Sequence, residues 1–578
     1  MTSFIEDANA PEKKVNVDED IVRKNTDDSL QVEMNDYLSK FLDMSNDAQE
    51  NESREKTMSL TEGLKTFPKA AAWSIVLSTA IVMEGYDLNL INSFYAFPSF
   101  NEKYGHYVES LGAYSIDTKW QTTLSMCANV GEIMGLFAAG IVADRIGYRW
   151  TLIASLMMVT GLIFIVFFAK DIGMLVAGEL LLGIPWGAFQ TLTVTYASEV
   201  CPLVLRVYLT TYVNVCWVFG QLISSGILRG FVNSTAKDSY RIPFALQWVW
   251  PIPIMIGIFL APESPWWYVK KGRLHQAKHS LKRLITTNEH LPNKDVLVDA
   301  MVNKMQLTVE KEYAISSSAS YWECFKGSDW RRTRIAAGAW VVQSITGSSL
   351  MGYSTYFYEQ AGLDTSMAFT FSIIQYVFGI VGTFGSWFLS RAAGRYTIYI
   401  GGLCTQIVVL LIVGGLGCAE GKAYSWAIGS LLFVFTFVYD LTIGPLCYCI
   451  VAEIPSVRLR TKTVVIARNV YNVAGIITAV ISPHMLNPES WNWKAKTGFF
   501  WAGFALASAI WVYFELPETK GKTFAELDAL FENKVKARKF KTTEVETFNV
   551  GTMMEALGEE GIKAAVQHNE NRGDVEKV

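Results

Sequence analysis

The chain has 578 residues, and 18% of them are charged, whereas about 25% are charged in a typical soluble protein. The net charge of −4 gives no basic excess of the kind that indicates a nucleic-acid partner. The shortage of charge is local, because residues 1–66 and 516–578 are polar throughout and long apolar stretches lie between them. This distribution favours a membrane protein with no nucleic-acid partner.

We do not expect the N-terminal segment to be a signal peptide. Residues 1–56 are rich in Asp, Glu, Asn and Lys and contain no apolar core. Such a composition cannot bury enough apolar surface to fold alone. We therefore expect a disordered tail that stays on the cytoplasmic side, and insertion into the membrane must use the first spanning helix.

Six apolar segments follow the tail, each bounded by charged residues, Gly or Pro. The stretch from Thr151 to Phe168 contains no charge and, as a helix, nearly crosses a bilayer core of about 30 Å. The six predicted spans are 69–95, 119–142, 150–168, 172–197, 207–229 and 243–262.

A polar stretch from Pro262 to Arg334 interrupts the apolar pattern. Helical patterning is visible within it at 274–284 and 296–308. Six further spans are predicted after it, at 335–358, 366–390, 396–417, 424–451, 463–485 and 497–516. A last amphipathic helix is expected from Phe524 to Phe531.

The sequence thus predicts an all-α membrane protein with twelve transmembrane helices in two six-helix halves. The expected parts are a disordered cytoplasmic N-terminal tail (1–66), an N-terminal half (67–262), a cytoplasmic helical linker (263–334), a C-terminal half (335–516) and a cytoplasmic C-terminal tail (517–578).

The orientation follows from the positive charges of the short loops. These charges lie in alternate loops, on the side shared by both tails and the linker: Arg145, Arg149, Arg206, Arg391, Arg395, Arg458, Arg460 and Lys462. We expect this side to be cytoplasmic. The bias is not absolute, because Arg229, Lys237 and Arg241 lie together in an opposing loop.

An internal repeat is visible in the loops. Glu199 and Arg206 follow the fourth span with the same spacing as Glu453 and Arg460 after the tenth. Charged Gly-containing turns likewise follow the second and the eighth spans. Two parallel repeats joined by a linker imply that one half rocks against the other around a site near the membrane midplane.

Five motifs carry a family resemblance: Gly85-Tyr86-Asp87, Gly140 through Arg149, Pro262-Glu263-Ser264-Pro265, Gly444-Pro445 before Glu453, and Pro517-Glu518-Thr519. In this order they resemble the sugar porter group of the major facilitator superfamily. The surrounding sequence, including Ala467-Arg468-Asn469-Val470-Tyr471-Asn472, is similar to the fungal maltose and general α-glucoside permeases.

The resemblance implies the major facilitator fold and a monomeric plasma-membrane protein with both termini in the cytoplasm. It also implies alternating-access symport of a proton with an α-glucoside, with maltose as the first candidate beside sucrose, trehalose, turanose and maltotriose. By analogy with fungal permeases, Lys13, Lys14 and Lys24 are candidates for ligation of ubiquitin. A simple solvated tail is the alternative.

Two positions depart from the family pattern. The family has Gly-Arg near the start of the fourth span, and this chain has Gly178-Glu179. That arginine commonly partners the aspartate of the first span, so the proton-coupling pair must be arranged differently here. Trp266 replaces the arginine that often follows the Pro-Glu-Ser-Pro motif.

Charged residues inside spans are the candidates for proton coupling, because each costs about 2.5–3.5 kcal/mol on insertion scales unless it has a partner or faces a cavity. Glu84 and Asp87 share one face of the first span; Glu132 lies in the second span and Arg468 in the eleventh. We expect the four to form one coupling centre in which Arg468 sets the proton affinity of a carboxylate. The alternative is that Glu132 and Arg468 only tie helices together. Whether Glu179 and Asp440 face the pore is left open.

Polar amides and tyrosines inside the spans are the candidates for sugar binding. Asn214 and Gln221 share a face of the fifth span and match substrate positions of sugar porters. Gln343 matches the first glutamine of a family motif whose second position is Ser344 here. The remaining candidates are Tyr353, Tyr448 and Asn472. The alternative is that these side chains bond helix to helix.

Charged residues of the loops resemble the cytoplasmic network that latches the outward-open state of the family. Such ion pairs break when the gate opens, and helix capping is the alternative. The residues are Asp144, Arg145, Arg149, Glu199, Arg206, Glu263, Arg391, Arg395, Glu453, Arg460 and Glu518.

No cofactor, metal or enzymatic activity is expected. The eight cysteines lie mostly in apolar stretches without zinc-ligand spacing, and neither polar segment contains a nucleophile elbow or phosphate loop. The alternatives to proton symport of α-glucosides are a transporter or facilitator of another sugar, and a transporter-like sugar sensor.

Overall fold

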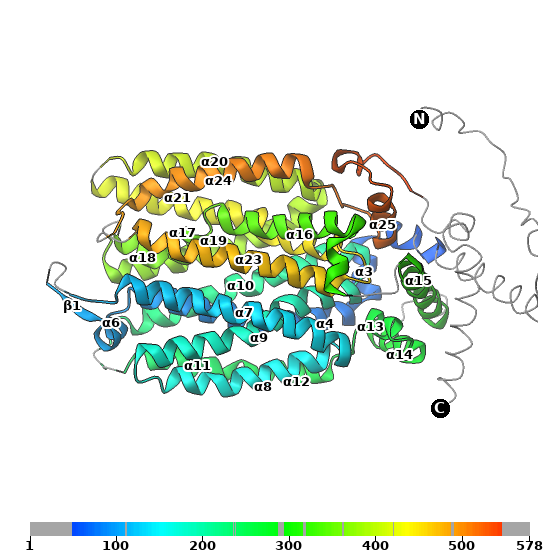
Figure 1. Cartoon of the computed structure of the whole chain (residues 1–578), viewed down its shortest axis with the longest axis horizontal. Helices are drawn as coiled ribbons and strands as arrows, with labels where there is room; N and C mark the ends of the chain where they lie inside the picture. The colour runs from blue at the N-terminus through cyan, green and yellow to red at the C-terminus, as the bar shows by residue number, and fades with distance from the viewer. Residues whose placement is uncertain are drawn as a thin grey trace, which may run out of the picture.

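The computed structural model describes residues 49–545 apart from 52, 110–112, 235, 237, 287–293, 316–319, 361–362, 420 and 487–489. Lys13, Lys14 and Lys24 lie outside the described residues. The described part is an elongated helix bundle whose helices run along its long axis (Figure 1).

Eleven membrane-length apolar helices are present among the described residues, and each overlaps one predicted span. They are Pro68–Phe94 (α4 Pro68–Ser78 and α5 Ala80–Phe94), α7 Thr118–Ile146, α8 Tyr148–Phe167, α9 Ile172–Val200, α10 Leu203–Phe231, Arg241–Leu260 (α11 Arg241–Leu246, η1 Gln247–Val249 and α12 Pro251–Leu260), α19 Thr365–Ala392, α20 Arg395–Leu416, Ala423–Glu453 (α21 Lys422–Leu441 and α22 Ile443–Glu453), α23 Arg460–Leu486 and Lys494–Glu515 (η3 Lys494–Lys496 and α24 Thr497–Glu515). The all-α twelve-span fold is confirmed, with a broken seventh span as the twelfth crossing.

The seventh span is not the single helix predicted for 335–358. It consists of α16 Gly327–Ile345, α17 Ser349–Gly352 and α18 Ser354–Gln360. The break occurs at Gly347, whose φ of +94° lies in the region that favours glycine. Broken helices inside transporters present unpaired backbone groups to a cavity.

Close helix packing in the first half depends on small residues. A Cβ at Gly131 of α7 would lie 2.0 Å from the Leu180 carbonyl oxygen of α9. A Cβ at Gly220 of α10 would lie 2.2 Å from the Val82 carbonyl oxygen of α5. Such small-residue contacts replace the hydrophobic effect as the basis of helix association in lipid.

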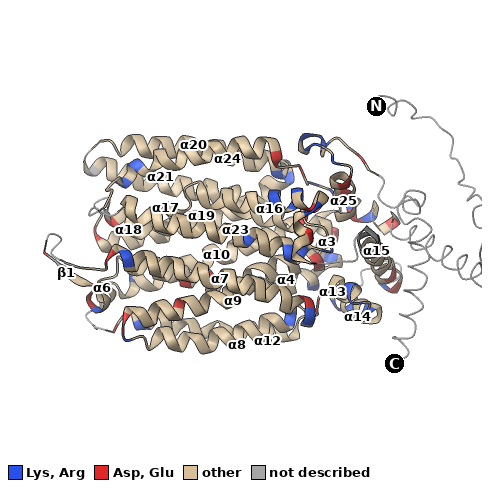
Figure 2. Ribbon diagram, viewed as in Figure 1, with Lys and Arg blue, Asp and Glu red and all other residues tan. Residues whose placement is uncertain are grey.

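The two ends of the bundle differ (Figure 1). One end, called the tail end here, carries α3 Leu60–Thr66, α13 Pro265–Lys270, α14 Leu274–Leu284, α15 Lys294–Ile315 and α25 Phe524–Glu532. The opposite end carries α6 Pro98–Tyr104 and a hairpin of β1 His106–Val108 and β2 Ala113–Ser115, which the sequence did not predict. Charged residues gather at the tail end, and few lie along the helices between the ends (Figure 2).

The predicted disorder of residues 1–66 is wrong for its last part. Ser59 caps α3 by accepting a hydrogen bond from the Glu62 N–H at 3.2 Å, and the Thr66 carbonyl oxygen accepts one from the Thr286 N–H at 2.9 Å. The segment is ordered because it packs on the bundle rather than folding alone. Of the other tail-end helices, α14, α15 and α25 lie where the sequence predicted linker and tail helices, whereas α13 was not predicted.

Candidate functional site

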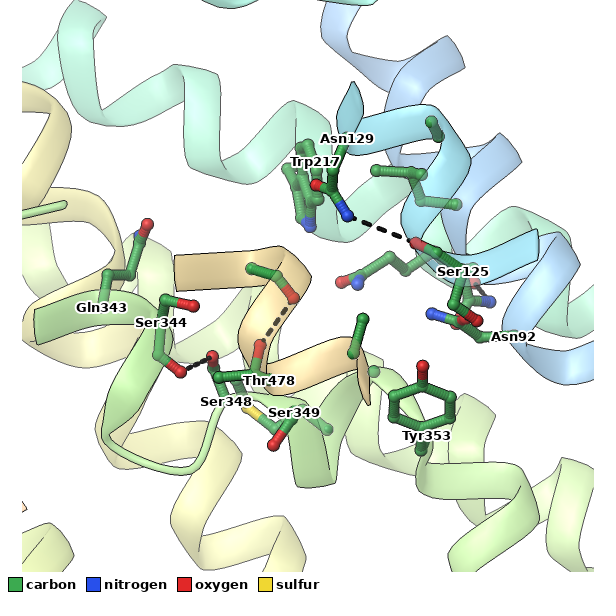
Figure 3. Close-up of a pocket in the computed structure, with 18 of the residues that line it drawn as sticks. Asn92, Ser125, Asn129, Trp217, Gln343, Ser344, Ser348, Ser349, Tyr353 and Thr478 are labelled. Atoms are coloured by element: carbon green, nitrogen blue, oxygen red, sulfur yellow. Dashed lines mark hydrogen bonds between the residues drawn. The ribbon is translucent and has the colours of Figure 1, made fainter. Parts of the chain in front are cut away.

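A cavity lies between the two sets of six helices. Both sets contribute to its wall, which is rich in amides, hydroxyls and aromatic rings (Figure 3). Five of the six predicted sugar ligands line it, namely Asn214, Gln221, Gln343, Tyr353 and Tyr448. Such a mixture of flat rings and directional polar groups suits a small polar ligand.

The predicted sugar ligands differ in how much hydrogen-bonding capacity they keep free. The Asn214 amide donates to Asp440 Oδ1 at 2.9 Å and to Thr383 Oγ1 at 3.1 Å, so it joins the two halves. The Gln343 amide donates to the Gly444 carbonyl oxygen at 3.1 Å. The sixth candidate, Asn472, does not line the cavity and lies buried beside Glu132 instead.

Further cavity residues were not singled out from the sequence. Asn89 and Asn92 lie one turn apart on α5, directly after Asp87, and their spacing was a usable signal. Ser125 donates to Asn92 Oδ1 at 3.1 Å, and Asn129 donates to the Ser125 carbonyl oxygen at 3.2 Å. These side chains lie across the cavity from Ser344, Ser348 and Thr478 (Figure 3).

Arg468 is the cation of the cavity wall and contacts two predicted coupling carboxylates. Its Nη2 lies 3.6 Å from Glu84 Oε1 and 3.7 Å from Glu132 Oε2. Gln190 donates to the other Glu84 oxygen at 2.8 Å. The guanidinium lies 4.1 Å from the Tyr471 ring and 4.6 Å from the Trp340 ring, and these stacking contacts stabilise a buried cation.

Asp87 does not join this cluster, so the structure separates the four groups that were expected to form one centre. Three residues along a helix correspond to about 4.5 Å of rise and about 60° of rotation. Glu84 therefore faces Arg468, whereas Asp87 accepts from the Gln247 amide at 2.6 Å and contacts the carboxyl of Glu179. Glu179 and Asp440, whose positions the sequence left open, both line the cavity.

At the tail end, buried ion pairs and hydrogen bonds join the two halves. Arg460 Nη1 lies 3.4 Å from Glu199 Oε1. The same carboxylate accepts from the Tyr148 hydroxyl at 3.2 Å, from Lys270 at 3.4 Å and from the Ser264 hydroxyl. We call this arrangement, with its counterpart at Glu453, the tail-end latch.

The counterpart follows the sequence repeat. Arg395 Nη2 lies 3.2 Å from Glu453 Oε1, and the Thr519 hydroxyl donates to Glu453 Oε2 at 2.6 Å. Ser264 and Thr519 occupy equivalent places after Glu263 and Glu518. The hydroxyl donors to Glu199 and Glu453 are therefore equivalent, whereas the cations differ, because Arg460 reaches Glu199 across the halves and Arg395 contacts Glu453 within one half.

Glu263 and Glu518 cap helices rather than bridge the halves. Glu263 accepts from the backbone N–H groups of Tyr148 and Arg149 at 3.1 and 3.0 Å, at the start of α8. Glu518 accepts from the Arg395 N–H at 2.8 Å, at the start of α20. Burial raises the pKa of Glu263 above its ordinary value, although these backbone hydrogen bonds oppose the shift.

Phe524, at the start of α25, lies between Arg206 and the latch residue Arg460. The guanidinium of Arg206 lies 3.7 Å from its ring and that of Arg460 lies 3.8 Å away. The N-terminal segment reaches the same place, because Glu55 accepts from the Leu203 N–H at 2.8 Å and contacts Lys304 at 2.5 Å. Burial would raise the pKa of Glu55, but Lys304 and Arg206 outweigh it and lower the pKa.

The other predicted gate residues are placed more loosely. Asp144 pairs with Lys462 across the halves. The Arg149 guanidinium lies 5.2 Å from the Trp150 ring and 5.0 Å from the Phe259 ring. Arg145 and Arg391 are exposed at the tail end, so the structure does not bring their side chains into the buried latch.

Comparisons with known proteins agree with this geometry. The family described as "Sugar (and other) transporter" matches residues 73–531. Maltose permease MAL61 of Saccharomyces cerevisiae is 50% identical over 505 residues, which are 87% of this chain and 82% of that protein. A general alpha-glucoside permease of the same organism is 47% identical over 534 residues, 92% of this chain and 86% of that protein. The proton:xylose symporter XylE bound to 6-bromo-6-deoxy-D-glucose has a TM-score of 0.68 at 19% identity, covering 80% of this chain and 99% of that one.

Proposed function

Because the chain belongs to the sugar transporter family, we propose that this multi-pass membrane protein carries an α-glucoside together with a proton. Maltose is the first candidate, with sucrose, trehalose, turanose and maltotriose as related substrates. The observation that carries the proposal is Arg468, which lines the cavity and contacts Glu84 and Glu132 at the same time. The relatives named maltose permease and general alpha-glucoside permease, at 47–50% identity, support the substrate class.

The cavity wall supplies what a disaccharide needs. Trp217, Tyr353 and Tyr448 offer ring faces against which the apolar faces of a pyranose can lie, and Gln221 and Gln343 offer amides for the hydroxyls. Asn92, Ser125 and Asn129 form a second polar wall on α5 and α7. A ligand that contacts both walls would bind most tightly when the two halves close around it.

The proton joins the cycle through the charge of the coupling cluster. With Glu84 and Glu132 both ionised and Arg468 cationic, the cluster has a net charge of −1, and one bound proton makes it neutral. A net charge in the bundle interior is costly, so the protonated form is favoured when the site is sealed from water. Loss of the proton towards the side of lower acidity then makes the cycle directional.

The tail-end latch supplies the gate. Its ion pair between Glu199 and Arg460 and the neighbouring pair of Asp144 and Lys462 join the halves. In this proposal the pairs close the tail end, and their separation opens it. Positive charge in the short loops favours a cytoplasmic position for the tail end. We assign the protein to the plasma membrane as a monomer with both termini in the cytoplasm.

The experiment is maltose-induced proton uptake by transporter-null yeast that produce the full chain, followed as alkalinisation of an unbuffered suspension. Sucrose, trehalose, turanose and maltotriose are tested in parallel, with glucose and xylose as other sugars. The proposal expects alkalinisation with maltose and labelled maltose accumulation above the external concentration. Accumulation without proton movement would refute symport, and the absence of any α-glucoside entry would favour a different sugar or a sensor.

A further inference from the structure

Asp87 and Glu179 form a second buried acidic pair, separate from the cluster at Arg468. Both side chains are at most 1% exposed, and their carboxyls are in contact. Glu179 lines the cavity, whereas Asp87 is not part of the cavity wall. The pair therefore has one member that lines the cavity and one that is sealed behind it.

Hydrogen bonding in this pair is incomplete. Asp87 Oδ1 accepts from the Gln247 amide at 2.6 Å, but Asp87 Oδ2 and Glu179 Oε1 are sealed from solvent and have no hydrogen-bond donor among the described residues. Two neighbouring carboxylates cannot both stay ionised in such a place, because like charges disfavour each other and burial disfavours both. A proton between the two carboxyls is the donor that this geometry lacks.

The side chains around Asp87 and Glu179 supply no positive charge that could stabilise two ionised carboxylates. The groups that face it are Gln247 from η1, Trp186 from α9, the Cys127 thiol from α7 and the Tyr95 hydroxyl after α5. Among the described residues, no Lys, Arg or His is among the groups that act on Asp87 or Glu179. Arg468, the cation of the cavity wall, pairs with Glu84 and Glu132 instead.

We propose that Asp87 and Glu179 share one proton as an acid–carboxylate pair and exchange it with the central cavity through Glu179. This inference rests on the proposed proton symport and adds a second proton site to it. The arginine that the family places at position 179 would hold Asp87 ionised by its charge, whereas the glutamate here holds a proton instead. Glu179 thus acts at the cavity surface and Gln247 acts as a positioning residue behind Asp87.

The test is the pH dependence of labelled maltose uptake by yeast that produce the full chain, compared for wild type, Glu179→Gln and Gln247→Met at matched surface levels. Glu179→Gln removes the like charge that favours protonation, so the pH of half-maximal uptake should fall by about one unit, or about a tenfold higher proton concentration. Gln247→Met removes a donor that favours the ionised form, so the same pH should rise.

Opposite shifts in the two variants would support the shared proton, because a merely structural role would not give them opposite signs. Glu179→Asp keeps a carboxyl and should stay close to the wild-type profile. If Glu179→Gln does not reach the membrane, Gln247→Met decides alone, and an unchanged profile in it overturns the inference. Wild-type chain without any proton uptake would refute the proposed symport, whereas coupled wild type with an unchanged Glu179→Gln profile would refute only the shared proton.

Discussion

The two buried charge clusters, the tail-end latch and the cluster at Arg468, are satisfied in different ways. Glu199 and Glu453 each receive a hydroxyl donor as well as a cation. In the cluster at Arg468, the ion-pair distances are 3.6 and 3.7 Å, and both Glu132 oxygens lack a hydrogen-bond donor among the described residues. Glu132 therefore has fewer hydrogen-bond donors than Glu199 and Glu453, and this difference fits the proposed role of the interior cluster in binding and releasing the proton.

Among the substitutions that test this comparison, Arg468→Ala should have the largest effect on maltose uptake. The change leaves Glu84 and Glu132 buried without their cation, and removal of one partner of a buried ion pair costs about 3–5 kcal/mol. We expect maltose uptake to fall by at least about 100-fold, measured with labelled maltose at matched surface levels. If Arg468→Ala took up maltose at the wild-type rate and this uptake still depended on the external pH, Arg468 would have no role in coupling.

Glu199→Gln should weaken the latch and leave the interior cluster intact. The amide loses its ion pairs with Arg460 and Lys270, so the tail end should open more often. Cys201, which is 5% exposed and lies beside the latch, should then react about fivefold faster with a membrane-permeant maleimide, a factor equal to about 1 kcal/mol. The reaction is measured by mass spectrometry of the Cys201 peptide.

Asp299→Asn is the matched control for this variant. It removes an exposed ion pair with Lys278 at 2.9 Å, and surface pairs contribute little to stability. The labelling rate of Cys201 should therefore stay at the wild-type value. Equal rates in wild type and Glu199→Gln would show that the latch does not hold the tail end closed.

Phe524→Ala should have a smaller effect of the same kind. Loss of the ring removes two cation–π contacts, to Arg206 and Arg460, each of about 0.5–2 kcal/mol. Because Arg460 keeps its ion pair with Glu199, Cys201 labelling should rise by only about two- to threefold. Phe524→Tyr retains the ring face and should label like wild type; an increase equal to that of the alanine variant would assign the effect to something other than the ring.

Glu518→Gln should have the smallest effect, because this residue caps α20 without bridging the halves. Loss of a charged helix cap costs about 1 kcal/mol, so the Tm of the purified protein should fall by a few degrees. Glu263→Gln removes the corresponding cap of α8 and should lower the Tm to a similar extent. A change in the number of protons taken up per maltose would contradict a purely structural role for these caps.

The free-energy cost of burying charge in the membrane explains which features were predictable from the sequence. Charge-free stretches and intramembrane charges stand out in a sequence, so the spans and the contacts of Arg468 with Glu84 and Glu132 could be anticipated. The repeat of Glu199 and Glu453 was also visible in the sequence, and the structure gives both carboxylates a hydroxyl donor from an equivalent position. The roles of these residues in proton coupling and gating remain predictions.

Features that depend on packing between helices could not be predicted. The 60° offset between Glu84 and Asp87 separates their partners, and Glu179 and Gln247 reach Asp87 only through the arrangement of α5, α9 and η1. Asn472 turns away from the cavity although it lies one turn beyond Arg468. The order of α3 depends on contacts with the linker and bundle that its own composition does not reveal.

The most direct test of the account compares Glu132→Gln with Glu199→Gln in membrane vesicles loaded with maltose, under an imposed pH gradient and without one. Glu132→Gln should retain maltose exchange between the two sides and lose accumulation against a gradient, because its cluster is fixed in a neutral form. Glu199→Gln should accumulate maltose to the wild-type ratio at an altered rate. Full accumulation by Glu132→Gln would contradict the assignment of the proton to the interior cluster.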